Sequence, residues 1–93
     1  MECESFEFTR HAVQKMFERD ISITIVKQVV KKGEVIQSYP NDKPYPSFLM
    51  LCVINKRPVH TVLAKDAANK KCIIITVYEP STELWSNGFR TKK

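Results

Sequence analysis

The sequence predicts one α+β domain in which two helices precede an antiparallel sheet of about four strands. Apolar residues recur at helical spacing across residues 9–32, which indicates amphipathic helices. Short β-branched runs then alternate with Pro, Asn and Asp across residues 34–79, which is typical of strands and turns. The 93 residues are 43% hydrophobic and 27% charged, which suits one globular domain spanning residues 1–93.

The first helix is expected to begin after Thr9, because this hydroxyl can accept a free backbone N–H of the first turn. An apolar stripe follows at helical spacing, formed by Ala12, Val13, Met16 and Phe17. The polar residues after Phe17 are expected to end this helix. We expect the apolar stripe to face the core.

The second helix is expected to begin after Ser22, another residue type that caps helices well. Val26, Val29 and Val30 form its predicted core face. Gly33 is the natural terminating residue, because glycine readily takes the left-handed conformation that closes many helices.

The strands are expected at residues 34–39, 47–54, 59–65 and 72–79, with a short edge strand possible at residues 6–8. Residues 40–46 contain three prolines, which lack the N–H group that a sheet requires, so this segment is a predicted loop. The run 47–54 is apolar on both faces, which is typical of an interior strand.

The C-terminal segment follows Pro80 and contains two large aromatic residues. Residues 81–85 are expected to form one helical turn. Trp85 and Phe89 are expected to dock this segment onto the sheet, and residues 91–93 form a basic tail that we expect to be flexible.

The net charge of +5 and the pI of about 9.2 favour a polyanionic partner such as RNA, DNA or an acidic protein. No apolar run approaches the ~18–20 residues that span a bilayer, and the polar N-terminus does not resemble a secretory signal. A soluble, cytoplasmic chain is therefore expected.

The cysteines are Cys3, Cys52 and Cys72, an odd number at wide spacing without a CxxC motif. This pattern argues against a disulfide framework and against a zinc site, and it suits a reducing cytosol. His11 and His60 lie far apart and show no ligand spacing, so no metal and no cofactor are expected.

Arg10 and His11 are the first candidates for a functional site. They fall in the first helical turn after Thr9, where free N–H groups and the helix dipole favour an anion such as phosphate. Arg10 adds a bidentate phosphate donor, and His11 can exchange a proton near neutral pH. A local capping or packing role for His11 is an equally weighted alternative.

His60, Tyr78 and Glu79 are the second set of candidates. His60 lies within a predicted strand and can be either a hydrogen-bonded structural residue or a catalytic one. Tyr78 and Glu79 end the last strand and point to opposite faces. Whether His60 meets Tyr78 depends on a strand register that the sequence leaves open, because a one-residue slip reverses the faces.

Three further arginines, Arg19, Arg57 and Arg90, are candidates for a groove that binds an RNA backbone. Tyr39 and Tyr45 offer faces on which bases can stack. The alternative is an ordinary solvated basic surface.

Four segments carry a resemblance to a known family: Phe8-Thr9-Arg10-His11-Ala12, Asp42-Lys43-Pro44-Tyr45-Pro46-Ser47, Ile75-Thr76-Val77-Tyr78-Glu79-Pro80, and Gly88-Phe89-Arg90. In these segments the chain resembles a bacterial family known as domain of unknown function number 4258. The family is similar to the RelE and BrnT toxins, and its members often lie beside a small zinc-finger antitoxin-like protein. The resemblance implies helices packed on one side of an antiparallel sheet and a candidate messenger-RNA endonuclease.

The leading hypothesis is therefore a toxin-like, metal-independent endoribonuclease that is neutralised by an antitoxin. His11 or His60 would transfer protons, Arg10 and Arg90 would hold the phosphate, and Tyr78 or Glu79 would orient groups or transfer protons. The alternative is a non-catalytic module that binds RNA or a partner protein. The sequence leaves open the RNA preference, the need for the ribosome and the oligomeric state.

Overall fold

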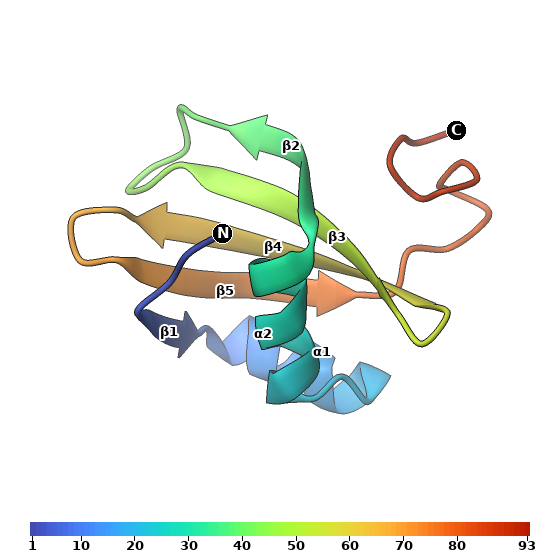
Figure 1. The fold of residues 1–93 in the computed structure, drawn as a ribbon, viewed down its shortest axis with the longest axis horizontal. Helices are drawn as coiled ribbons and strands as arrows, with labels where there is room; N and C mark the ends of the chain where they lie inside the picture. Colours follow the sequence, from blue (N-terminus) through green and yellow to red (C-terminus); the bar gives the residue numbers. More distant parts are fainter.

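The computed structural model describes all residues from 1 to 93 and contains one sheet with two helices (Figure 1). The elements in chain order are β1 (Ser5–Phe8), α1 (Arg10–Arg19), α2 (Ile23–Lys32), β2 (Glu34–Tyr39), β3 (Ser47–Ile54), β4 (Arg57–Asp66) and β5 (Lys71–Tyr78). Neither helix has the length and the apolar run needed to cross a membrane.

The five strands form one mixed sheet in the order β1-β5-β4-β3-β2. Strands β2 to β5 run antiparallel to their neighbours, whereas β1 pairs with β5 in parallel and forms one edge. The predicted α+β class, with two helices before an antiparallel sheet, is confirmed. The short N-terminal segment is also confirmed as an edge strand, and it makes the sheet five-stranded.

The starts of both helices agree with the sequence. The Thr9 hydroxyl accepts the backbone N–H of Ala12 at 3.0 Å, and the Ser22 hydroxyl accepts the backbone N–H of Ile25 at 3.1 Å. Asp20 ends α1 in the left-handed conformation with φ of 54°. The predicted N-caps are therefore confirmed.

Gly33 ends α2, but in a conformation that differs from the predicted one. Its φ is −75°, in the extended region rather than the left-handed one. A Cβ atom at this position would lie 2.6 Å from the carbonyl oxygen of Leu51 and closer still to that of Val29. Glycine is required here because two backbones approach each other closely, and not because of its φ angle.

The main core lies between the helices and one face of the sheet. Its members are Ala12, Met16, Ile21, Val26, Val29, Val30, Met50, Val59, Leu63, Cys72, Ile74 and Val77. The predicted core face of α2 is confirmed. For α1 the prediction is only half right, because Val13 is 52% exposed and Phe17 is 89% exposed. Their apolar side chains lie on the solvent side of α1.

The C-terminal segment covers part of the other face of the sheet. A turn closed by the Trp85 N–H and the Ser81 carbonyl oxygen at 3.0 Å brings the Trp85 indole to within 4.4 Å of the His60 ring, centroid to centroid. Trp85 is only 6% exposed. The predicted docking of this segment is confirmed.

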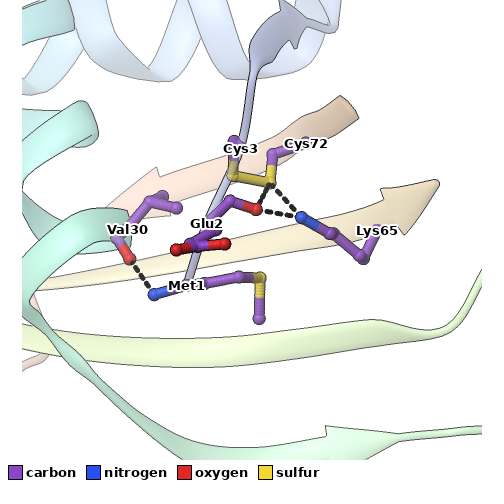
Figure 2. Close-up of a disulfide and its surroundings, with 6 residues drawn as sticks. All are labelled: Met1, Glu2, Cys3, Val30, Lys65 and Cys72. Atoms are coloured by element: carbon purple, nitrogen blue, oxygen red, sulfur yellow. Dashed lines mark hydrogen bonds between the residues drawn. A yellow bond between two sulfur atoms is a disulfide. The ribbon is translucent and has the colours of Figure 1, made fainter. Parts of the chain in front are cut away.

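A disulfide joins Cys3 to Cys72 across 69 residues of sequence (Figure 2). The expectation that the cysteines form no disulfide is therefore wrong. The parallel pairing of β1 with β5 aligns Ser5 with Lys71, and this alignment carries the preceding Cys3 to the start of β5. Cys52 is the one free cysteine.

Candidate functional site

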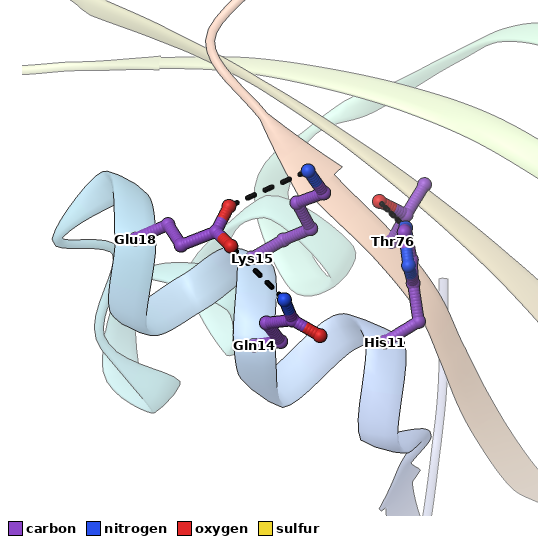
Figure 3. Close-up of polar contacts among 5 residues, drawn as sticks. All are labelled: His11, Gln14, Lys15, Glu18 and Thr76. Carbon is purple, nitrogen blue, oxygen red and sulfur yellow. Dashed lines mark hydrogen bonds and ion pairs between the residues drawn. The ribbon is translucent and has the colours of Figure 1, made fainter.

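His11 lies at the start of α1 beside β5. Thr9 fixes this position, because its N–H donates to the Ile74 carbonyl at 3.1 Å and its hydroxyl donates to the Ile75 carbonyl at 3.1 Å. The Nε2 atom of His11 consequently lies 3.1 Å from Oγ1 of Thr76 (Figure 3). His11 is exposed, so its imidazole is both oriented by a neighbour and open to a ligand.

Arg10 precedes His11 and is also exposed. It forms no ion pair, in contrast to Arg57 and Arg90. The first turn of α1 contains no acidic residue that would neutralise the partial positive charge of the helix start. Arg10 and His11 are therefore both exposed at a helix start that no acidic side chain of the first turn neutralises.

A row of polar side chains continues along α1 from His11 to Lys15 and Glu18, at spacings of four and three residues. Figure 3 shows these side chains and Gln14 along α1, with His11 next to Thr76 of β5. The Lys15 ammonium lies 3.4 Å from Oε2 of Glu18, and the Gln14 amide donates to Oε1 at 3.1 Å. Hydrogen bonds from Gln14 and Lys15 lower the pKa of Glu18, which favours its carboxylate form.

Lys15 and Glu18 are residues that the sequence reasoning missed. Their spacing from His11 is the signal that predicts a common helix face. The surface formed by Arg10, His11, Lys15, Glu18 and Thr76 is called the α1 polar face below. Its charged and titratable groups are two cations, one imidazole and one carboxylate.

His60 and Tyr78 lie elsewhere, on the sheet. They stand opposite each other on β4 and β5, and Nδ1 of His60 lies 3.2 Å from the Tyr78 hydroxyl oxygen. The other ring nitrogen, Nε2, lies 2.9 Å from the Phe89 carbonyl oxygen, which implies a donating N–H there. The register that the sequence left open therefore brings the two residues together.

Burial determines the protonation of this pair. His60 is 0% exposed, and burial lowers the pKa of its imidazole, while the Phe89 carbonyl opposes this shift. Burial also raises the pKa of the Tyr78 phenol, with a smaller contribution from Tyr39. The geometry is that of a hydrogen-bonded structural histidine, the alternative that the sequence kept open for His60.

Arg57 and Glu79 form a clamp near the C-terminal end of α1. Arg57 Nε lies 2.5 Å from Oε1 of Glu79, while its Nη1 and Nη2 atoms donate to the Asp20 and Arg19 carbonyls at 3.0 and 2.6 Å. The guanidinium thus donates hydrogen bonds to carbonyl groups that have no partner within the helix at its C-terminal end. The side chain of Arg19 itself is exposed.

Arg90 lies far from the α1 polar face. Its guanidinium forms an ion pair of 2.6 Å with Glu34, the first residue of β2. Strand β2 is at one edge of the sheet, and β1, which leads into α1, is at the other. The structure does not bring Arg90 to His11, so the two residues cannot hold one phosphate within this chain.

No group of three His, Cys, Asp or Glu side chains is arranged so that it could hold a metal ion. The imidazole, cations and carboxylate of the α1 polar face are groups suited to proton transfer and to anion binding.

The fold and this surface define a small α+β domain with an exposed histidine at the start of a helix. Comparison with known proteins assigns the chain to one family. The model of the family described as domain of unknown function (DUF4258) matches residues 8–79, and the chain belongs to this family. No curated protein and no solved structure is similar to the chain.

Proposed function

We propose that this protein is a metal-independent endoribonuclease of the toxin type, with the α1 polar face as its active site. The observation that carries the proposal is the contact between His11 Nε2 and Thr76 Oγ1 at 3.1 Å. It orients an exposed imidazole beside an unpaired arginine and a helix start, which are groups suited to a phosphodiester.

The reaction would be attack of a ribose 2′-hydroxyl on the adjacent phosphate. His11 would take the hydroxyl proton as a general base, and Thr76 would hold the imidazole in position. Arg10 and Lys15 would stabilise the charge that develops on the phosphate oxygens. The new bond between the 2′-oxygen and phosphorus forms as the 5′-oxygen leaves, and water protonates this leaving group.

Glu18 would act through Lys15 and not on the substrate. Its carboxylate lies 3.4 Å from the Lys15 ammonium and limits the positions that this side chain can take. Glu18 is therefore a positioning residue. Tyr78 and Glu79 have no role in this mechanism, because they bond to His60 and Arg57.

We also propose a protein partner for this chain and a cytoplasmic location for its substrate. An antitoxin-like protein with acidic side chains would cover the α1 polar face, since complementary charge accelerates association with a chain of net charge +5. The exposed Val13 and Phe17 on the same helix would add apolar contacts. The substrate would be cytoplasmic RNA, either free or on the ribosome.

A cleavage assay tests the proposal. The purified chain and its His11→Gln variant are incubated with single-stranded RNA in excess EDTA, with and without ribosomes. We expect the variant to lose at least about 100-fold in rate, the usual contribution of a general base. His60→Gln is the matched control at the other histidine, and it should retain activity while it remains folded.

A second candidate function is a non-catalytic module that binds RNA or a partner protein. The observation that favours it is the exposure of Phe17 at 89%, which is unusual for a large apolar side chain. In that case wild type and His11→Gln show no cleavage under any condition. Phe17→Ser then weakens capture of the partner, while Arg10→Ala lowers only salt-sensitive RNA affinity.

A further inference from the structure

The disulfide lies beside a pocket that shares no residue with the α1 polar face. The pocket has a volume of about 500 Å³ and is formed by the N-terminal segment, the end of α2 and the turn between β4 and β5. Its lining includes Cys3, Lys31, Lys65 and Lys70. Neither the fold nor the proposed ribonuclease function explains this cluster of cations around a disulfide.

The two sulfur atoms of the disulfide differ in access. Cys72 is 0% exposed and lies in the core, whereas Cys3 is half-buried and lines the pocket. A nucleophile that enters the pocket can therefore meet Cys3 Sγ but not Cys72 Sγ. Access decides which sulfur is attacked in thiol–disulfide exchange.

The two sulfur atoms also differ in charge environment. The Lys65 ammonium lies 3.8 Å from Cys72 Sγ and also donates to the Glu2 carbonyl oxygen (Figure 2). A cation at this distance stabilises a thiolate. Cys72 is consequently the better leaving group, and Cys3 the better target.

The charges of the side chains that line the pocket favour some ligands over others. Three lysines line it against two carboxylates, those of Glu2 and Glu4, and the Glu4 carboxylate pairs with Lys70 at 3.6 Å. The lining side chains thus carry a net positive charge with carboxylates among them. This arrangement suits a ligand that bears carboxylates together with an amine.

We propose that this pocket is a binding and modification site for a small acidic thiol peptide, of which glutathione is an example. The thiolate of the peptide attacks Cys3 Sγ, and a new S–S bond forms there as the Cys3–Cys72 bond breaks. The electron pair leaves with Cys72 Sγ, whose thiolate is held by Lys65. The exchange needs no other oxidant or reductant, and it does not depend on the proposed ribonuclease function.

The modification releases the N-terminal segment from β5. Residues before β1 are otherwise held by hydrogen bonds such as that from the Met1 amino group to the Val30 carbonyl at 2.8 Å. The pairing of β1 with β5 and the core remain in place. The site is therefore expected to carry the adduct on a folded protein.

The experiment uses the full chain after oxidation in air. Thiol titration of the unfolded protein should detect one free thiol, that of Cys52. The folded protein is then treated with glutathione or with glutathione dimethyl ester at equal thiolate concentration. After acid quenching, peptide mass spectrometry locates the adduct and gives the rate.

We expect the adduct on Cys3, with Cys72 as the free thiol. Glutathione should react at least about threefold faster than its dimethyl ester, which keeps the ammonium group but lacks both carboxylates, because opposite charge raises the encounter rate. This preference should disappear in the Lys31→Met/Lys70→Met variant and at about 1 M salt, where charges are screened. The Lys43→Met/Lys56→Met variant, at exposed lysines outside the pocket, should keep it.

Three results would overturn the proposal. The first is a count of three free thiols in the oxidised protein. The second is an adduct on Cys72 in place of Cys3. The third is equal reaction rates for glutathione and its ester in the wild-type chain.

Discussion

His60 and Tyr78 stand directly opposite each other on β4 and β5, and the imidazole Nδ1 lies 3.2 Å from the phenol oxygen. The other imidazole nitrogen holds the Phe89 carbonyl, so one buried side chain connects two strands to the C-terminal segment. This relationship fixes the end of the sheet and leaves His11 as the histidine that a substrate can reach.

The stability of the protein should depend on the protonation of His60. Burial lowers its pKa from the ordinary value of 6.5, so the unfolded chain takes up the proton at higher pH than the folded one. The stability gained from the neutral form is complete above about pH 6.5 and is lost as pH falls from there through the folded pKa. We expect a lower urea midpoint at about pH 5.5 than at about pH 7.5.

The matched variants are His60→Gln and His11→Gln. His60→Gln should be less stable than wild type at neutral pH, but its urea midpoint should fall less between the higher and the lower pH. The urea midpoint of His11→Gln, which changes an exposed residue, should fall as much as that of wild type. An unchanged pH dependence in His60→Gln would mean that other groups cause it.

Arg57 should stabilise the end of α1 through its three acceptors. Arg57→Met should lower the free energy of unfolding by about 2 kcal/mol, since charge-assisted hydrogen bonds to two carbonyls are lost. Glu79→Gln should cost less than about 1 kcal/mol, because this ion pair is partly exposed. Urea denaturation measures the free energy of unfolding of both variants. Equal losses of stability would show that the ion pair with Glu79 contributes more than the bonds to the carbonyl groups.

Thr61 should be a position where a substitution stabilises the protein. Its side chain is fully buried, and its hydroxyl has no hydrogen-bond partner. Thr61→Val removes the unsatisfied hydroxyl at nearly constant volume, so we expect a gain of about 1 kcal/mol. The exposed Thr24→Val is the control. A loss of stability in Thr61→Val, read by thermal unfolding, would indicate a bonded hydroxyl.

Gly33 should not tolerate a side chain. The Cβ of alanine would meet the carbonyl oxygens of Val29 and Leu51, which are backbone atoms and cannot move aside cheaply. Gly33→Ala should cost about 1–3 kcal/mol, as overpacking usually does. Lys32→Ala, one residue earlier on the exposed side, should change stability little. Equal midpoints for the two variants in urea would contradict this account.

Local signals in the sequence predicted local structure well. Thr9 and Ser22 cap the helices as expected, because a cap needs only the hydroxyl and the next turn. The apolar stripe on α1 led to the wrong prediction that Phe17 faces the core. Periodicity indicates that a helix is amphipathic, but it does not say which of the apolar residues contact the sheet. Gly33 misled for a similar reason, because the close approach of the Val29 and Leu51 carbonyl oxygens requires glycine there, and a left-handed conformation does not.

The pairing of distant strands could not be predicted from one sequence. The parallel pairing of β1 with β5 joins segments more than 60 residues apart, as the Cys3–Cys72 separation of 69 shows. The same pairing carries Thr9 to Ile74 and so places His11 beside Thr76. Arg10 and His11 were identifiable as candidates from their place after a cap, but the contact with Thr76 depends on this distant pairing.

The most direct test of the account compares RNA with its 2′-O-methyl form as substrates in excess EDTA. The account predicts that the wild-type chain cleaves RNA to products with 2′,3′-cyclic phosphate ends and leaves the 2′-O-methyl strand intact. His11→Gln should leave both strands intact while circular dichroism shows the native fold. Cleavage of the methylated strand, or undiminished cleavage by folded His11→Gln, would contradict the assignment of His11 as the base for a 2′-hydroxyl.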